Sequence, residues 1–193
     1  MKLSCLALAL LLAGCAVPSH DAPSAAAMAD EMSSWQPEAQ TPQHKWLMRA
    51  VGSWESVGTM EGGDGAPMEM RSTESVRAVG DYWIVNELDA DMFGMPFRGV
   101  MTLGFDPKAG HFVGTWLDST NSMLWHYTGK LDPAGNTLTL DTEGPLPWAP
   151  ERNGKYRESL EITGPDSKVF TSTVQQDDGT WMQIMRVESK RKG

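Results

Sequence analysis

Cysteine is almost absent from this chain of 193 residues, and this absence limits how it can be stabilised. Cys5 and Cys15 are the only two, both close to the N-terminus, so the remaining chain can form no disulfide and must rely on packing. Histidines and cysteines show no spacing typical of a metal site. The sequence also lacks a Gly-x-Ser-x-Gly nucleophile motif. We therefore predict no catalytic residue, no metal and no cofactor.

Basic residues are scarce compared with acidic ones. The chain has 16 Lys and Arg against 25 Asp and Glu, a formal net charge of -9 at pH 7. Nucleic acids and anionic lipid surfaces select clusters of Lys and Arg, so nucleic acid is not expected as a partner. No apolar run reaches the roughly 20 residues that a membrane-spanning helix needs.

The first fifteen residues have the pattern of a secretory signal. A basic start at Lys2 is followed by an apolar run over residues 3–12 and small residues before Cys15, as in a cleaved signal peptide. The end of this segment resembles the bacterial lipobox, in which a diacylglyceryl group is attached to the cysteine. The resemblance implies a signal peptide over 1–14 and lipid attachment at Cys15. Ala16 rather than Asp follows the cysteine, which implies anchoring to the outer membrane, facing the periplasm, with the acyl groups as the membrane contact.

Residues 15–40 differ in composition from the rest of the chain. They are rich in Ala, Ser and Pro, and such a segment cannot bury enough apolar surface to offset the entropy cost of ordering. We predict a flexible, lipid-anchored tether over 15–40 and one domain over 41–193.

The domain begins with a predicted short helix. Thr41 suits the N-cap, Pro42 suits the first helical position, and Gly52 ends the pattern. After Gly52, short runs rich in Val, Thr, Trp, Tyr and Phe alternate with clusters of Gly, Pro, Asp and Asn, which indicates strands and turns. The predicted strands are 53–60, 68–78, 82–90, 97–105, 111–117, 123–131, 137–143, 154–163, 168–175 and 180–189.

These strands predict an all-β fold: an antiparallel, up-and-down barrel of about eight to ten strands. A closed barrel is favoured over a sandwich because closure leaves no long exposed edge. Three prolines between 144 and 153 predict a long loop there, since proline does not fit inside a sheet.

Two parts of the sequence resemble known families. Gly52-Ser53-Trp54 is similar to the Gly-x-Trp that opens lipocalin-like (calycin) barrels. Residues 94–99, 102–106 and 112–119 resemble the bacterial domain-of-unknown-function 1579 family, over about 43–191. The family implies a lipocalin-like β-barrel and brings no accepted activity. The haem-binding nitrobindins also begin with Gly-x-Trp but rely on a late histidine, and no histidine follows His126.

Tryptophan and methionine are abundant, with 8 and 13 residues. Together they form an apolar and adaptable lining, as in sites for varied hydrophobic ligands. Gly52 and Trp54 are predicted to form the barrel floor. The residues predicted to line a ligand-binding lumen are Trp83, Met101, Trp116, Trp125 and Met185. The alternative, that these side chains simply fill the barrel, stays open.

Charged residues within the strands suggest two further features. Glu87, Asp89 and Asp91 alternate, so they share one strand face, which we predict to be the solvated outer face. Four arginines lie in mid-strand, and at least one is expected to point inward and to pair with a ligand carboxylate. These are Arg71, Arg98, Arg157 and Arg186.

Three functions are consistent with these features. The first is a lipid-anchored envelope protein that binds a small apolar or amphipathic ligand in its lumen. The second is a structural or protein-interaction module of the envelope with a filled barrel, and the third is an enzyme acting on small hydrophobic substrates. A cavity above roughly 300 Å³ with an inward Arg or Tyr favours the first. Two polar titratable groups in hydrogen-bond reach favour the third.

Overall fold

The computed structural model describes residues 24–34, 36–61, 67–92 and 94–193. The chain divides into two compact units, Met1–Glu38 and Ala39–Gly193. The predicted signal peptide and Cys15 lie outside the described residues. Within the described ranges, no helix has the length and apolar character that crossing a membrane requires.

The first unit contains α1, Ala25–Ser34. This helix lies inside the segment predicted to be a flexible tether, and it was not expected. Its sequence begins with three alanines and continues with Met, Asp and Glu. Alanine is the strongest helix former and methionine and glutamate are good ones, so local propensity favours a helix in a segment whose overall composition suggests disorder.

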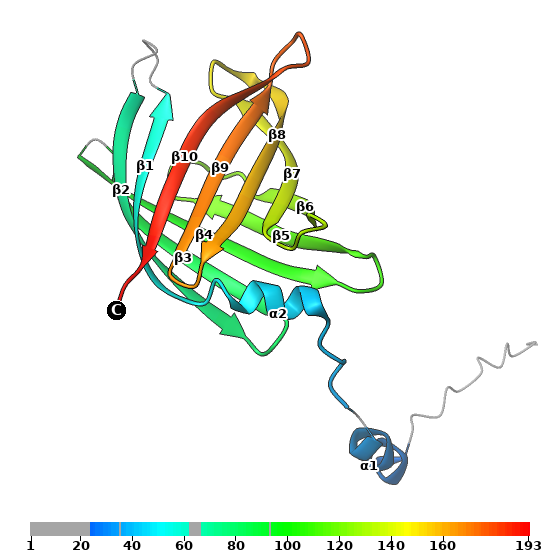
Figure 1. The fold of residues 1–193 in the computed structure, drawn as a ribbon. Coiled ribbons are helices and arrows are strands. Elements are labelled where there is room, and N and C mark those ends of the chain that lie inside the picture. The colour runs from blue at the N-terminus through cyan, green and yellow to red at the C-terminus, as the bar shows by residue number, and fades with distance from the viewer. Residues whose placement is uncertain (1–23, 35, 62–66, 93) are drawn as a thin grey trace, which may run out of the picture. The chain divides into compact units, whose positions relative to one another are not determined.

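The second unit is a closed barrel of antiparallel strands, in which β1 pairs with β10 as well as with β2. The predicted fold class is confirmed (Figure 1). A short helix, α2 over Pro42–Met48, precedes the strands. The ten strands in the described residues are β1 Gly52–Glu61, β2 Pro67–Val79, β3 Trp83–Met92, β4 Met95–Asp106, β5 His111–Asp118, β6 Trp125–Leu131, β7 Thr137–Leu146, β8 Ala149–Gly164, β9 Ser167–Gln175 and β10 Trp181–Arg191.

Helix α2 closes one end of the barrel (Figure 1). Thr41 is its N-cap, and the Thr41 hydroxyl accepts a hydrogen bond from the His44 backbone N–H at 3.4 Å. Trp46 and Leu47 are buried in the core at this end. The Trp46 indole donates to the backbone carbonyl of Gly135 at 2.9 Å, which ties the helix to the turn before β7.

Trp54 and Arg191 join the first and last strands beneath the lumen. Trp54 is 1% exposed, and its indole N–H donates to the carbonyl of Ala50 at 2.9 Å. The Arg191 guanidinium lies 4.2 Å from the centre of the Trp54 ring. It also donates to the carbonyls of Val51 at 2.6 Å and Arg49 at 3.0 Å. One side chain from the end of the chain therefore caps the connection between α2 and β1.

Gly52 is required by this arrangement. Its φ of +140° is a conformation that other residues rarely adopt, and a Cβ there would lie 2.2 Å from Nη1 of Arg191. The glycine therefore permits both the chain reversal into β1 and the close approach of the arginine.

Glycines also make room for tryptophan rings in the wall. A Cβ at Gly99 would lie 2.0 Å from the ring of Trp116, and one at Gly144 would lie 2.2 Å from the ring of Trp125. Each ring therefore lies flat against a glycine of a neighbouring strand, which keeps space free inside the barrel.

The long loop predicted over 144–153 is wrong. Strand β7 continues to Leu146, β8 begins at Ala149, and Pro145 pairs with Asn153 beside a register shift. On its other side, β7 pairs with β6 only as far as Asp141. Pro145 therefore has no β6 partner that would need the N–H it lacks.

We expect Arg191→Ala to lower the free energy of unfolding by about 2 kcal/mol, because the carbonyls of Arg49, Val51 and Pro165 lose a donor and the Trp54 ring loses its cation. Lys190→Ala, at the exposed neighbouring position, should change it by less than about 0.5 kcal/mol. Urea denaturation of both variants, followed by tryptophan fluorescence, measures the difference. Equal effects would contradict the role of Arg191.

Candidate functional site

The lumen of the barrel is hollow. A cavity of about 450 Å³ extends from Ala50 at the closed end to Met92 and Pro147 at the opposite rim. Its walls are mainly apolar. Four of the predicted lumen residues line this cavity: Met101, Trp116, Trp125 and Met185. Methionine contributes further lining side chains at Met60, Met70 and Met92.

Trp83 does not line the cavity, which corrects its prediction as a lumen residue. Ile84, Asn86 and Leu88 of the same strand line the lumen, so the alternation of β3 places Trp83 on the outer face. There it is 41% exposed and covers Gly104 of β4. Trp83 is the first residue of its strand, where the sequence pattern does not define the inward face.

The lower part of the lumen contains a buried ion pair. Lys168 Nζ lies 2.6 Å from Glu74 Oε2, with side-chain exposures of 6% and 7%. Three more donors reach the same carboxylate: Ser56 Oγ at 2.9 Å, Asn86 Nδ2 at 2.7 Å and Ser189 Oγ at 3.2 Å. We call these five residues the Glu74 network.

The Glu74 network keeps its carboxylate ionised. Burial alone would raise the pKa of Glu74, but the charge of Lys168 and hydrogen bonds from Lys168, Ser56 and Asn86 together hold that pKa below its ordinary value. Lys168 also lies 4.9 Å from the centre of the Trp54 ring. The Lys168–Glu74 ion pair therefore has hydrogen-bond and ring partners on several sides, and it lies next to Trp54 at the closed end of the barrel.

Glu158 is the second carboxyl in the wall of the lumen; the residue is half-buried, and no cation pairs with it among the described residues. Ser172 Oγ donates to Glu158 Oε1 at 3.4 Å, whereas Oε2 is buried without a hydrogen-bond partner. Burial raises the pKa of Glu158 to about 7, and hydrogen bonds from Tyr127 and Ser172 act in the opposite direction but are outweighed. This carboxyl therefore changes its protonation state near neutral pH.

Two tyrosines face the same region. Burial, and then the charge of Glu158, raise the pKa of Tyr127 well above its ordinary value and that of Tyr156 to about 12. Both phenols therefore stay protonated. The Tyr156 hydroxyl donates to the carbonyl of Pro145, and the Tyr127 hydroxyl is the one associated with Glu158.

Two oxygens at the lumen wall have unused hydrogen-bonding capacity. Glu158 Oε2 and Asn86 Oδ1 are both buried and unpaired among the described residues, and both side chains line the cavity. An unpaired buried polar atom costs about 1–3 kcal/mol, so such atoms are rare unless something else satisfies them. They mark where a donor on a bound molecule would be stabilised.

Glu158 and Lys168 are lumen residues that the sequence pattern did not predict. A signal for Glu158 was present, because it alternates with Tyr156, Leu160 and Ile162, so a carboxyl interrupts the apolar face of β8. Lys168 lies at the start of β9, where its inward direction follows only from the register with Ser189 on β10.

The expectation of an inward arginine is wrong. The four candidate side chains are 43–81% exposed and pair with acidic residues on the outside of the barrel. Asp89 is one of these partners, with Arg98 at 2.8 Å, and the predicted outer face of Glu87, Asp89 and Asp91 is confirmed. No arginine lines the lumen in the described residues.

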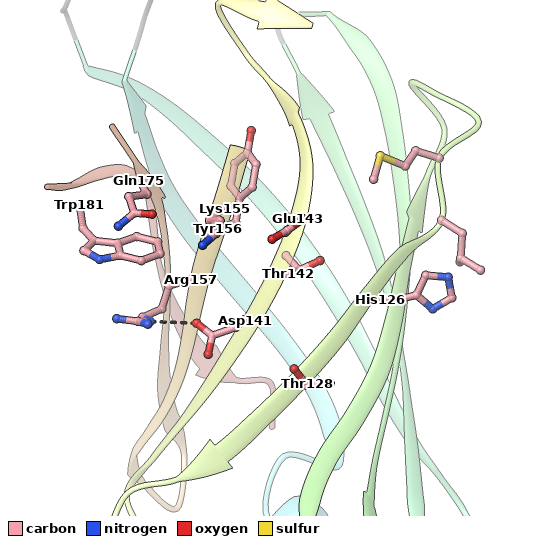
Figure 2. Close-up of a pocket in the computed structure, with 12 residues that line it drawn as sticks. His126, Thr128, Asp141, Thr142, Glu143, Lys155, Tyr156, Arg157, Gln175 and Trp181 are labelled. Atoms are coloured by element: carbon pink, nitrogen blue, oxygen red, sulfur yellow. Dashed lines mark hydrogen bonds and ion pairs between the residues drawn. The ribbon is translucent and has the colours of Figure 1, made fainter. Parts of the chain in front are cut away.

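A second hollow, of about 670 Å³, lies outside the barrel wall (Figure 2). Strands β6 and β7 pair only between Thr128–Leu131 and Leu138–Asp141, and beyond this point they diverge (Figure 2). Arg157 pairs with Asp141 at 3.0 Å and lies 4.4 Å from the centre of the Trp181 ring. We call this hollow the outer groove.

Tyr156 lines both the outer groove and the lumen. On the lumen side the ring of Trp125 meets that of Tyr156 edge to face, with 5.1 Å between ring centres. The outer groove is an open surface hollow with a mixed lining of charged, polar and apolar side chains, whereas the lumen encloses apolar walls with a few buried polar groups. The lumen is therefore the stronger candidate for a small-molecule site. In the described part of the chain, no His, Cys, Asp and Glu side chains form a group of three or more that could hold a metal ion.

Comparisons with known proteins agree with this architecture. Residues 39–191 match the family described as "Protein of unknown function (DUF1579)", and a comparison with curated proteins returned no match. Among solved structures, Rv2717c from M. tuberculosis is similar, with a TM-score of 0.60 and 16% identity over 80% of this chain and 100% of the other. The S-type phycobiliprotein lyase CPES from Guillardia theta has a TM-score of 0.52 and 14% identity over 81% and 99%. At these identities the likeness shows the fold alone.

We expect Glu158→Gln to make the folded protein more stable above pH 7. The pKa of Glu158 is about 7 in the folded state against an ordinary 4.5, so the folded state holds the proton longer and stability falls as pH rises through this window. In the wild type, the free energy of unfolding falls by up to about 3 kcal/mol as the pH rises through this window. Urea denaturation at pH 4, 6 and 8 measures it.

The matched control for this experiment is Glu161→Gln, on the exposed face of the same strand. It should follow the wild-type pH dependence. If wild type and Glu158→Gln instead give parallel curves, Glu158 does not titrate in the window described.

Proposed function

We propose that this chain, which belongs to the DUF1579 family, binds a small apolar or amphipathic ligand in the lumen of its barrel. The supporting observation is the cavity of about 450 Å³, which has apolar walls and two unpaired buried oxygens. Small-molecule sites are typically cavities of about 300–1,000 Å³ with mainly apolar linings and a few polar groups. The hollow lumen argues against the alternative function, a structural or interaction module with a filled barrel.

Methionine and tryptophan suit this function for different reasons. Methionine side chains are flexible and polarizable, so they adapt to ligands of different shape. Tryptophan offers a large rigid surface, and Trp116 and Trp125 are each backed by a glycine that keeps their rings against the wall. The lining therefore combines fixed aromatic surfaces with adaptable side chains.

The proposed setting of this function is the cell envelope. The lipobox-like pattern ending at Cys15 supports acylation there, and a tether over 15–40 would separate the barrel from the membrane. We propose attachment to the outer membrane with the barrel facing the periplasm. The acyl groups would hold the protein at the membrane while the lumen exchanges ligand with the surrounding solution.

One observation favours a second function, catalysis on a small hydrophobic substrate. Tyr127 and Glu158 lie in hydrogen-bond reach within an enclosed lumen, and such a pair can hold and move a proton at a bound molecule. A phycobiliprotein lyase with this fold shows that such barrels can also be enzymes. Native mass spectrometry of the protein from its own host identifies the bound molecule. Incubating that molecule with the purified protein then distinguishes the two functions, since an enzyme converts it to a product and a carrier returns it unchanged.

The neutral apolar probe N-phenyl-1-naphthylamine should bind saturably, at one site per chain, and quench tryptophan emission. Met101→Trp places a bulky ring inside the lumen and should weaken binding by at least about tenfold. Leu117→Trp, at a position of β5 that is 46% exposed, adds the same ring outside and should bind as the wild type does. A flat titration, or equal weakening in both folded variants, would count against a lumen site.

Cys15→Ser should move the protein from the membrane fraction to the soluble fraction of its host, because the acylated side chain is lost. Cell fractionation followed by immunoblotting measures this. Cys5→Ser, within the predicted signal peptide, is the matched control and should stay membrane-bound. Tight membrane association of Cys15→Ser would refute the proposed anchor.

A further inference from the structure

The charged side chains of the lumen are unbalanced. Three acidic residues line the cavity, Glu74, Asp118 and Glu158, against one basic residue, Lys168. Lys168 pairs with Glu74 at 2.6 Å and both are buried, so this pair is neutral as a unit. The remaining charge inside the barrel is negative.

Asp118 contributes a fixed negative charge at the open end. It is the last residue of β5, and its carboxylate accepts hydrogen bonds from the Trp116 indole at 3.1 Å and from the Thr120 backbone N–H at 2.8 Å. These donors hold the carboxylate in place without neutralising it. A cation entering the lumen passes this charge, whereas an anion is opposed by it.

Glu158 is the one lumen carboxylate with a free position for a cation. Its Oε2 is buried and unpaired among the described residues. The carboxyl accepts a long hydrogen bond from Ser172 Oγ at 3.4 Å and one from the Tyr127 hydroxyl. Removing a carboxylate from water without a counter-ion is costly, and a cation in contact with it offsets that cost.

We infer that the ligand of the lumen is a cationic amphiphile: an apolar body carrying a protonated amine, whose ammonium group pairs with Glu158. This inference rests on the proposed lumen-binding function and specifies its ligand class. The ammonium group donates to Glu158 Oε2, while the apolar body lies against the methionine and tryptophan side chains. The rings of Trp125 and Tyr156 line the same lumen and also attract a cation.

A fatty-acid ligand fits this lumen poorly. Its carboxylate would meet Asp118 at the open end and Glu158 inside, while the arginines that could bind it are on the outer surface. Lys168 is already hydrogen-bonded to Glu74. Like charges in a poorly solvated site repel strongly, so the acid should bind more weakly than the amine of equal length.

Binding of the amine is coupled to a proton. The titratable groups facing Glu158 are Tyr127 from β6 and Tyr156 from its own strand, while β7 presents Leu140 at the paired position and β9 presents Ser172. Both phenols stay protonated, so Glu158 is the group that titrates near pH 7. When the ammonium form of the ligand pairs with protonated Glu158, one proton leaves the carboxyl for the solvent.

The experiment compares three probes with twelve-carbon chains: dodecylamine, dodecanol and dodecanoate, each below its micelle concentration. Isothermal titration calorimetry at pH 7, in two buffers with different ionisation heats, gives both the affinity and the number of protons released. We expect dodecylamine to bind at least about tenfold more tightly than dodecanoate. Because the pKa of Glu158 is about 7, about half a proton should be released per amine, and none at pH 9.

Substitutions test whether the amine preference and the proton release arise at Glu158 inside the lumen. Glu158→Gln should lose both the amine preference and the proton release, and Glu161→Gln should retain both. Met101→Trp should block all three probes, which separates lumen binding from attraction of amines to the acidic outer surface. The absence of proton release at pH 9 is tested in the wild type, so the inference is testable even if Glu158→Gln does not fold.

The possible results separate the two proposals. Equal or tighter binding of dodecanoate, an amine preference that persists in Glu158→Gln, or amine binding that survives Met101→Trp overturns the cationic ligand and leaves lumen binding of dodecanol intact. If none of the three probes binds, the proposed function itself fails.

Discussion

The structure depends on the closure of its barrel where the last strand meets the first. Arg191 of β10 stacks on Trp54 of β1 and donates to the carbonyls between α2 and β1, so the two ends of the domain are fixed to the helix that covers the floor. Closure gives every strand a paired neighbour on both sides, although β6 and β7 separate beyond Asp141. It also makes the lumen a cup, sealed at one end, in which side chains from strands far apart in sequence face each other.

Two buried carboxyl groups in this cup have opposite roles because their surroundings differ. Glu74 has a cation and three further donors, so its charge is stabilised without any ligand. Glu158 has neither a cation nor a full set of donors. A satisfied buried network makes the interior rigid and specific, whereas an unsatisfied group stores free energy that a partner can release. The first holds the side chains of the lumen in place, and the second is the group to which we assign the selectivity of the proposed site.

The sequence predicted the strands because their signals are local: alternating runs, and turns rich in Gly, Pro and Asp. These predictions failed where the orientation or pairing of a residue depends on its neighbours in space. Pro145 is tolerated in a strand because β6 does not pair with it, and Trp83 lies outside because its neighbours Ile84 and Asn86 point in. The size of the lumen was also beyond the sequence, since it depends on how rings such as Trp116 lie over Gly99. The unpaired state of Glu158 depends on four strands at once.

The short ladder between β6 and β7 gives the barrel an uneven stiffness. Those strands pair only over Thr128–Leu131 and Leu138–Asp141, whereas β1 pairs with β2 along its whole length from Gly52 to Glu61. Elements with fewer backbone hydrogen bonds open at lower free energy, so we expect the β6–β7 junction to open before the closed end of the barrel does. The β6–β7 flank is therefore the part of the wall expected to deform most easily.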